Sequence, residues 1–574
     1  MSYHLTLFGR RNIVERVRSR FSEEECAVVK NSRQWSTLVV SNSVLTVASR
    51  LPGDGLRASI FGGYAVDYAG GFVAFPDADE SYLPDPGAPV DGCYFRAIST
   101  PDGFECGGDS LHYGSLLWTS GDGFFAVSDS LMVLVHLRSV LNESITVDEE
   151  TVRGRDWTNS MGCAQMGHET ICKEVQFATM GSRLSYKVAS EMPVVEYGQL
   201  TSLLPSDGST HRSEIRRAGI RMASLVGALA SSGEHSVLAL SGGLDSRLCL
   251  AAAIRSGSLE GLNVRCQKNS TNDYAVAVGL ADQFGFDLNP TLGAMQGTLQ
   301  EMDLFGSWAV TSLGLYDQLY VPKYFRSIDA ASFSLGGQGA EAAKGNFRWR
   351  KLSAIAMPAT ALDQAERAVE RLGIDRNDKW GSEWQYLAFR NGLHANRSLV
   401  SSDYCVRPTA QLPLIGLSRS DIHELDNQNS KMQSVISDTL IALSPDLAAV
   451  DFDNHAKNLS RDTIDSRLAV LGGPIDSSEI TPLSIVGNPA PSRGVTKSFI
   501  DIACSYGISG NMDGTSVDRI VSGMDSCMWK KTRVGSEIWD QVRVDKRARI
   551  PATSREGAAV GKIVGWSWVE SLSA

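Results

Sequence analysis

One stretch of the chain combines the residue types that bind an oxyanion: Ser241, Gly242, Gly243, Leu244, Asp245 and Ser246. Its adjacent glycines allow a tight turn in which backbone N–H groups approach a bound anion, and its serines add hydroxyl donors. The stretch lacks the lysine of a Walker loop and the spacing of a dinucleotide-binding fingerprint. Because it also carries one carboxylate, it suits a pyrophosphate group bound together with Mg²⁺.

Short apolar runs predict the strands that would position such turns. Residues 236–240 precede the first turn and read as a buried strand, and residues 247–254 after it read as a helix. Residues 333–335 predict another strand, which leads into a second glycine-rich turn at residues 336–341. The second turn ends on a carboxylate, that of Glu341, so the two turns share one pattern.

Strands and helices continue to alternate between the two turns. Residues 262–266 predict a buried strand, and residues 273–284 predict a helix with Asp273 in its first turn. This alternation predicts a parallel sheet with helices on both faces, in which ligands bind at the carboxyl ends of the strands. We therefore expect both glycine turns and Asp273 at that edge. A helix N-cap is the alternative interpretation of Asp273.

The first part of the chain has a different sequence pattern from the second. Up to about residue 150 it consists of short strand-like segments separated by Gly, Asp and Pro clusters, which predicts a β-rich or α+β domain. Residues 203–212 have the composition of a linker. A chain of 574 residues is too long for one ordinary core. We therefore expect two domains, at residues 1–205 and 206–574.

Composition excludes several classes of protein. The formal net charge of −11 argues against nonspecific nucleic-acid binding, but it does not exclude a local basic channel. No apolar run approaches the roughly 20 residues that span a bilayer, and residues 1–5 do not start a signal peptide, so a cytoplasmic location away from membranes is expected. The ten cysteines and nine histidines form neither Cys-x-x-Cys nor His-Glu-x-x-His, which disfavours zinc sites.

Residues 241–246 resemble the pyrophosphate loop of the ATP pyrophosphatases, and most of the chain is similar to the asparagine synthetase family. That family has a second motif, Ser-Gly-Glu-Gly-Ala-Asp-Glu-Leu-Phe-Gly-Gly-Tyr, in whose place residues 336–347 stand here. Residues 407–414 resemble the family's Arg-x-Pro region. Residues 105–118 and 125–131 resemble the closing strands of its N-terminal glutaminase domain.

The resemblance implies a two-domain protein of α/β and α+β type. Its first domain would be an Ntn-type glutaminase-like sandwich, and its second a parallel-sheet ATP pyrophosphatase domain with extra helices. A glutaminase of this fold needs a cysteine as its first residue after Met removal, since the thiol is the nucleophile and its own amine the base. Ser2 and Tyr3 stand there instead. We therefore expect a degenerate first domain without glutaminase chemistry.

The second turn also departs from the motif of the asparagine synthetase family. Gln338 replaces a Glu that asparagine synthetases use in amide formation, Glu341 replaces an Asp, and Ala342 removes a further acid. β-Lactam synthetases and lasso-peptide macrolactam synthetases likewise combine a vestigial first domain with an adenylating second domain. They activate a carboxylate as acyl-AMP, which an amine of the same substrate then attacks.

The resemblance implies ATP and Mg²⁺ as cofactors and assigns roles to individual residues. Asp245 and Glu341 would be catalytic and would hold Mg²⁺ against the pyrophosphate. The hydroxyls of Ser241 and Ser246 and the backbone of residues 242–244 would donate to its oxygens. Three residues would frame the adenine: Leu240, Val264 and Gly337.

Two further roles come from the same resemblance. Asp273 would lie near the ribose or the metal. A lysine beyond the Arg-x-Pro region would stabilise negative charge in the amide-forming step. Lys457 is the first candidate for this catalytic lysine and Lys497 the alternative.

The sequence therefore predicts an AMP-forming carbon–nitrogen ligase. Its substrate would be a precursor peptide or a small natural-product precursor, most specifically a peptide that a lasso-type cyclase closes into a macrolactam, with a leader peptidase of the same pathway as a partner. Two alternatives stay open: a glutamine-independent asparagine synthetase or intermolecular amide ligase, and a non-catalytic scaffold. A tRNA-modifying pyrophosphatase is disfavoured by the acidic balance and by the first domain.

Overall fold

The computed structural model describes residues 4–291 apart from 42–43, 52–54, 112, 156–163 and 234, and residues 332–506 apart from 345–349, 397–403, 426–433 and 490–496. It also describes the short segments 299–300, 305, 308–309, 314–315, 325–326 and 536–537, and the stretch 552–573. Ser2 and Tyr3, on which the expectation of a degenerate glutaminase depends, lie outside these ranges.

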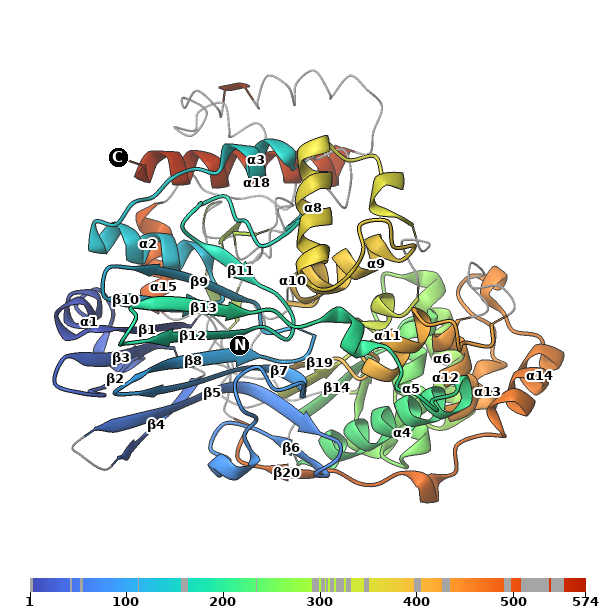
Figure 1. The fold of residues 1–574 in the computed structure, drawn as a ribbon. Helices are drawn as coiled ribbons and strands as arrows, with labels where there is room; N and C mark the ends of the chain where they lie inside the picture. Colours follow the sequence, from blue (N-terminus) through green and yellow to red (C-terminus); the bar gives the residue numbers. More distant parts are fainter. Residues whose placement is uncertain are drawn as a thin grey trace.

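The first part of the chain forms two mainly antiparallel sheets, and a strand from residues 484–486 adds a parallel edge to the larger one (Figure 1). One has the strand order β11-β9-β10-β1-β3-β2, and the other has the order β13-β12-β8-β7-β5-β6-β20 with β4 paired to β5. The bounds of these strands are β1 Leu5–Arg10, β2 Cys26–Val29, β3 Trp35–Val40, β4 Val44–Arg50, β5 Leu56–Asp67, β6 Phe72–Ala74, β7 Asp91–Thr100, β8 Gly103–Gly108, β9 Leu116–Gly121, β10 Phe124–Ser128, β11 Gln176–Ala178, β12 Arg183–Lys187, β13 Met192–Glu196 and β20 Ser484–Val486.

Aromatic side chains from both sheets fill the space between them. Phe8 stacks on Trp35 with ring centroids 5.1 Å apart and on Phe104 at 6.0 Å, while Phe125 stacks on Tyr186 at 5.9 Å. The neighbouring residues of β1 point to the opposite face, as the two-residue period of a strand requires. There they meet helices α1 (Arg11–Arg18) and α2 (Leu131–Leu141), which gives a helix–sheet–sheet arrangement.

The second part contains the expected parallel sheet. Its strand order is β15-β14-β18-β19, and every pairing is parallel. The bounds are β14 His235–Ala239, β15 Asn263–Arg265, β18 Ser332–Leu335 and β19 Tyr404–Val406. The first three match the strands expected from the apolar runs to within one residue at each end.

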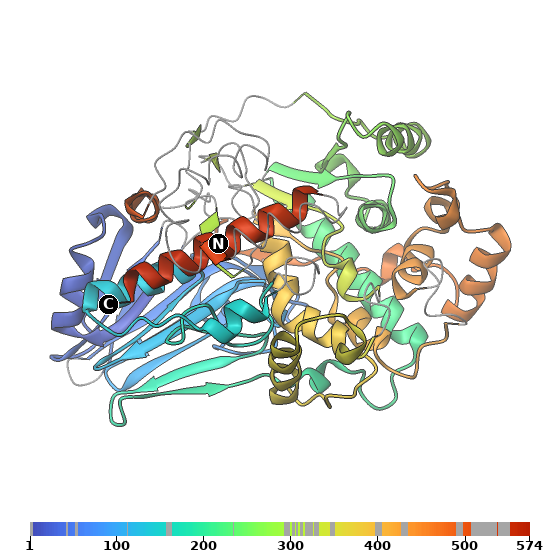
Figure 2. The same ribbon diagram turned by 90° about the horizontal axis from the view of Figure 1, so that it is seen from above.

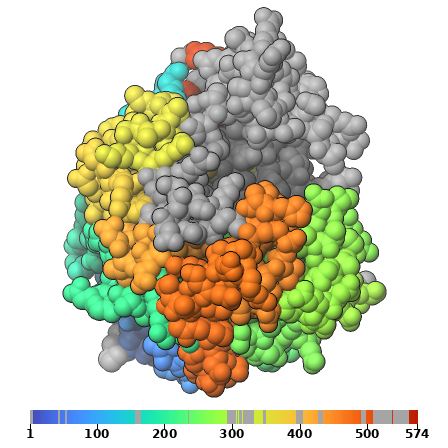
Figure 3. All heavy atoms as spheres, turned by 90° about the vertical axis from the view of Figure 1, so that its right-hand side faces the viewer, coloured from blue at the N-terminus to red at the C-terminus, as the bar shows by residue number. Residues whose placement is uncertain are grey.

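Helices surround this sheet (Figure 2). Helix α4 (His211–Ala230) begins with a capping box between Thr210 and Ser213, and it packs on α5 (Leu244–Arg255). Helix α6 (Thr271–Phe284) follows β15. Further α-helices have these bounds: α3 Glu149–Gly154, α8 Ala359–Arg371, α9 Gly381–Gln385, α10 Asn391–Asn396, α11 Leu412–Ser418, α12 Val435–Leu443, α13 Pro445–Ala448 and α14 Arg461–Leu471. In Figure 3 the orange segment that includes α14 lies beside the light-green segment that includes α6 on one face of the molecule.

The chain returns to the first part after α14. Strand β20 pairs in parallel with β6, as an edge strand of the larger antiparallel sheet. Helix α15 (Lys497–Ser505) packs on α2, and the ring of Phe499 meets that of Phe21 with centroids 5.9 Å apart. A simple division at residues 205 and 206 therefore leaves out β20, because its backbone hydrogen bonds belong to the first part of the chain.

The C-terminal helix α18 (Ala552–Leu572) also contacts the first part. The ammonium group of Lys562 donates to the backbone carbonyl of Arg155 over 2.6 Å. Within the described part of the chain, no helix has both the length and the apolar character needed to cross a membrane.

Candidate functional site

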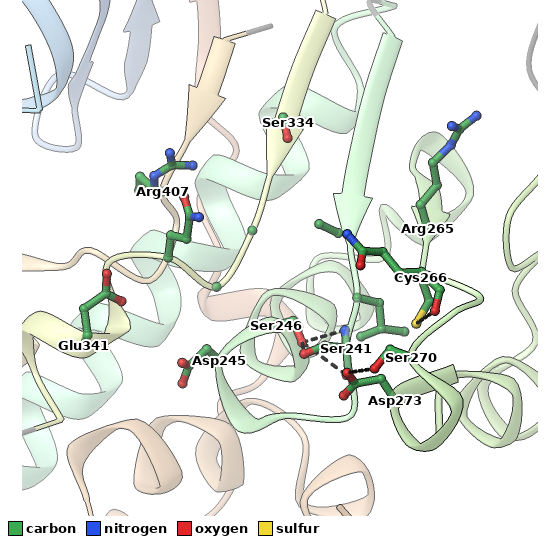
Figure 4. A pocket seen from close by; sticks show the side chains of 16 residues that line it. Ser241, Asp245, Ser246, Arg265, Cys266, Ser270, Asp273, Ser334, Glu341 and Arg407 are labelled. Carbon is green, nitrogen blue, oxygen red and sulfur yellow. Dashed lines mark hydrogen bonds between the residues drawn. The ribbon is translucent and has the colours of Figure 1, made fainter. Parts of the chain in front are cut away.

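A cavity of about 490 Å³ opens at the carboxyl ends of β14, β15 and β18 (Figure 4). This is the edge at which a parallel sheet binds its ligands. Of the residues to which the sequence assigns a binding or catalytic role, seven line it: Leu240, Ser241, Asp245, Ser246, Asp273, Gly337 and Glu341. Gln338 lines it as well. The tertiary structure thus brings the two glycine turns and Asp273 to one place.

The first glycine turn is closed by its own serines. The Ser246 hydroxyl accepts a hydrogen bond from the Ser241 backbone N–H over 3.0 Å, and the two hydroxyls lie 2.9 Å apart. Gly243 is the N-cap of α5 and provides no side-chain cap. The N–H groups of the first helical turn therefore remain for a ligand, and the helix dipole favours a negative charge there.

Asp273 holds this turn from outside. One of its carboxylate oxygens accepts from the Gly242 backbone N–H over 2.8 Å, and the other accepts from the Ser270 hydroxyl over 2.5 Å. Helix α6 begins at Thr271 with Ser270 as its N-cap, so the N-cap interpretation of Asp273 is wrong. With both oxygens engaged, Asp273 acts on the shape of the glycine turn.

The second glycine turn presents Glu341 on a short 3₁₀ segment, Ala340–Ala342. Its carboxylate accepts from the Gly339 backbone N–H over 2.8 Å and from the Tyr386 hydroxyl over 3.4 Å. Tyr386 starts a π-helical turn, Tyr386–Arg390, between α9 and α10, and such turns are frequent at functional sites. Burial, together with the nearby Glu341 carboxylate, raises the pKa of Tyr386 well above its ordinary value, so this phenol stays a hydrogen-bond donor.

Lys344 is a charged residue of the site that the sequence analysis did not identify. Its ammonium group forms an ion pair with the Asp245 carboxylate, and thereby joins the second turn to the first. Sequence offers no signal for this pair, because it connects residues from separate strand–turn units.

Two arginines of the cavity wall had no role assigned to them from the sequence. Arg265 is the last residue of β15, and Arg407, the first residue of the Arg-x-Pro-like region, directly follows β19. Arg407 is 8% exposed and also lines a second, water-sized cavity of about 20 Å³ with Tyr64 and Tyr113 of the first part of the chain. In the same segment the Thr409 hydroxyl lies 2.9 Å from the Gln338 carbonyl oxygen, to which it donates, so this segment supports the second turn.

The two lysine candidates lie in different surroundings. Lys457 does not line the cavity, but its ammonium group lies 3.0 Å from the Asp453 carboxylate, and the Asp453 backbone N–H donates to the Gly242 carbonyl over 3.2 Å. Lys457 is therefore linked to the first glycine turn through one residue. Lys497 is exposed and starts α15, which packs on α2 (Figures 1 and 2).

Val264 does not reach the cavity wall. It lies in the middle of β15, fully buried and paired with Leu238 of β14. Leu240, at the end of the neighbouring strand, does line the cavity, and its N–H donates to the Arg265 carbonyl over 2.7 Å.

The donor set fits a magnesium ion that binds together with phosphates. Among the described residues no three His, Cys, Asp or Glu side chains gather into a metal site of their own. Magnesium, however, is commonly held by one or two carboxylates and by the phosphates of its nucleotide. Asp245 and Glu341, both on the wall of one cavity, supply hard oxygen ligands of this kind.

No family model matches the chain, and no curated protein matches it. Several solved structures show a weak likeness to this chain. An allosteric regulatory enzyme of purine biosynthesis is 9% identical with a TM-score of 0.20, covering 58% of this chain and 74% of that one. Glutamine phosphoribosylpyrophosphate amidotransferase from B. subtilis, complexed with ADP and GMP, is 10% identical with a TM-score of 0.22, covering 60% and 77%. A likeness at this level assigns no activity to this chain.

Proposed function

We propose that this protein is an ATP-dependent amide-forming ligase that works through an acyl-adenylate and releases AMP and pyrophosphate. The observation that carries the proposal is the meeting of two glycine-rich turns, each with a carboxylate, in one cavity at the carboxyl edge of a parallel sheet. The cavity volume of about 490 Å³ lies within the range of small-molecule sites, about 300–1,000 Å³.

In the first step a substrate carboxylate oxygen attacks the α-phosphorus of ATP, and the bond from that phosphorus to the pyrophosphate oxygen breaks. Neutralising the leaving pyrophosphate is the main electrostatic task. The Ser241 and Ser246 hydroxyls and the N–H groups at the start of α5 would donate to it, while Asp245 and Glu341 would hold Mg²⁺. Leu240 and Gly337 would border the adenine, and the buried Val264 would support that wall from behind.

In the second step an amine attacks the acyl carbon, AMP leaves, and the amine loses a proton. Lys457, linked to the first turn through Asp453, would stabilise the negative charge that develops. Gln338 lines the cavity where the asparagine synthetase motif has Glu, and an amide cannot accept a proton as a carboxylate does. This favours an amine that already belongs to the bound substrate.

The most specific form of the proposal is macrolactam formation on a precursor peptide, as in a lasso-type cyclase that works beside a leader peptidase. The first part of the chain would then be a degenerate, Ntn-type glutaminase-like sandwich. Its helix–sheet–sheet layering is consistent with that identity.

The test is an assay of the full chain with ATP, Mg²⁺ and a candidate precursor peptide, in which AMP, pyrophosphate and product mass are followed. A product lighter than the precursor by one water supports cyclisation. An amide product formed with ammonium as the only amine would favour an intermolecular ligase instead. If the wild type releases no pyrophosphate in the presence of substrate, the alternative that the protein is a non-catalytic scaffold is favoured. The control is Asp245→Asn, which should release none.

A further inference from the structure

The carboxylate of Asp245 is already occupied by a cation of the protein itself. The Lys344 ammonium pairs with its Oδ1, and the two side chains remain 25% and 31% exposed. Asp245 lies in the first turn of α5 and on the cavity wall, whereas Lys344 follows the 3₁₀ segment of the second glycine turn. The pair therefore sits where the metal ion of the proposed reaction would bind.

The two turns that carry the pair are closely packed. Gly337 lies so close to Asp245 that a Cβ at residue 337 would come 2.5 Å from the Asp245 Cβ. The Thr409 hydroxyl donates to the Gln338 carbonyl from the other side. The second turn thus packs against the first, and the two residues between Glu341 and Lys344 place the ammonium group within reach of Asp245.

The other candidate metal ligand is hydrogen-bonded rather than ion-paired. Glu341 accepts from the Gly339 N–H and from the Tyr386 hydroxyl. A divalent cation that binds the Asp245 carboxylate without a nucleotide therefore competes with the Lys344 ammonium group. A nucleotide changes this balance, because its phosphates bring negative charge that can accept the released ammonium.

We propose that Lys344 is an internal counter-cation of Asp245, which competes with the divalent cation for this carboxylate and makes metal binding depend on the nucleotide. The inference rests on the proposed function, in that Asp245 is taken as a metal ligand. In the nucleotide-free protein Lys344 neutralises Asp245. In the nucleotide complex it pairs with phosphate oxygens, while Asp245 turns to the metal.

The first test measures binding of Mn²⁺ to the full chain without nucleotide, by electron paramagnetic resonance of the free ion. Lys344→Met should bind Mn²⁺ about fivefold more tightly than the wild type, which corresponds to the roughly 1 kcal/mol of an ion pair at this exposure. Lys344→Arg should stay within about twofold of the wild type, since it keeps the charge. Asp245→Asn in the Lys344→Met background should remove the gain.

A matched control separates this contact from a general change of charge. Lys268 is exposed and adjoins Gln267 of the same cavity wall. Lys268→Met removes one positive charge at that edge and should leave Mn²⁺ affinity unchanged. An equal gain in Lys268→Met, or no gain in Lys344→Met, would overturn the proposal. Should Lys344→Met not fold, as judged by circular dichroism, Lys344→Gln replaces it.

The second test measures binding of inorganic pyrophosphate in the presence of EDTA. Lys344→Met should bind it about fivefold more weakly, because the ammonium partner of the phosphate oxygens is lost. In Lys344→Met the affinity for Mn²⁺ should rise while the affinity for pyrophosphate falls. This distinguishes the proposed role from simple support of the fold, because a loss of structure would weaken the binding of both. Wild-type release of AMP and pyrophosphate is assayed separately, so a failed Lys344 proposal and a failed ligase proposal give different results.

Discussion

Gly337 lies directly against the backbone of Asp245, so the two glycine-rich turns touch at a point that has no room for a side chain. A Cβ at residue 337 would come 2.4 Å from the Asp245 carbonyl carbon and 2.5 Å from the Ser246 amide nitrogen. The second turn thus packs directly on the first turn of α5, the helix that follows the first glycine turn.

Gly337→Ala should therefore impair both stability and activity. We expect a destabilisation of about 1–3 kcal/mol from overpacking. Pyrophosphate release should fall about 100-fold, because small displacements of reacting groups are costly. Gly336→Ala is the matched control, since a Cβ there meets nothing within 4 Å. Thermal unfolding and the pyrophosphate assay measure both effects, and equal losses in the two variants would contradict the contact.

Asp273 should affect nucleotide affinity through the glycine turn rather than through the metal. Asp273→Ala removes the acceptor of the Gly242 N–H, and we expect ATP to bind about tenfold more weakly, in line with the roughly 1.5–3 kcal/mol of a hydrogen bond to a charged group. Asp273→Asn keeps an acceptor oxygen and should retain most of the affinity. A large shift in the Mg²⁺ requirement of Asp273→Asn would show instead that Asp273 is a metal ligand.

The two lysine candidates should separate in a two-step assay. Lys457→Ala should retain substrate-dependent exchange of pyrophosphate into ATP, which reports adenylation, and lose about 100-fold or more in amide formation, the order of one lost oxyanion donor. Lys497→Ala should match the wild type in both, because Lys497 is exposed at the start of α15. The reverse pattern would transfer the catalytic role to Lys497.

His168 should make the protein acid-sensitive. Burial lowers the pKa of His168 to about 4, below its ordinary 6.5, since its ring packs against Tyr197 and Phe389. The unfolded chain then binds a proton more readily than the folded one. Stability is thus fully present above pH 6.5 and is lost as the pH falls towards 4.

His168→Gln should reduce the fall in unfolding temperature between pH 7.5 and pH 4. Part of that fall should remain, because burial also lowers the pKa of His136 to about 4. The exposed His455, whose ring nitrogen lies 3.8 Å from Asp451, provides the control. His455→Gln should keep the wild-type profile, and an unchanged slope in His168→Gln would contradict the assignment.

Local sequence predicted much of the scaffold around the site. Strand bounds follow to within one residue from short apolar runs, whose preferences act over a few neighbours. The two helices after the strands also exist as expected, but α5 begins three residues and α6 two residues earlier than predicted. Errors of this size are expected at helix ends, where small polar residues adjoin the first turn.

The sequence by itself determined that two strand–glycine–carboxylate turns exist and that they share the carboxyl edge of a parallel sheet. Only the tertiary structure decided how the charges pair. Lys344 on Asp245, Tyr386 on Glu341 and Asp273 on the Gly242 N–H each join separate elements. The return of β20 to the first part of the chain is of the same kind. Such contacts depend on how whole helices and strands pack, and chain-local preferences carry no information about that.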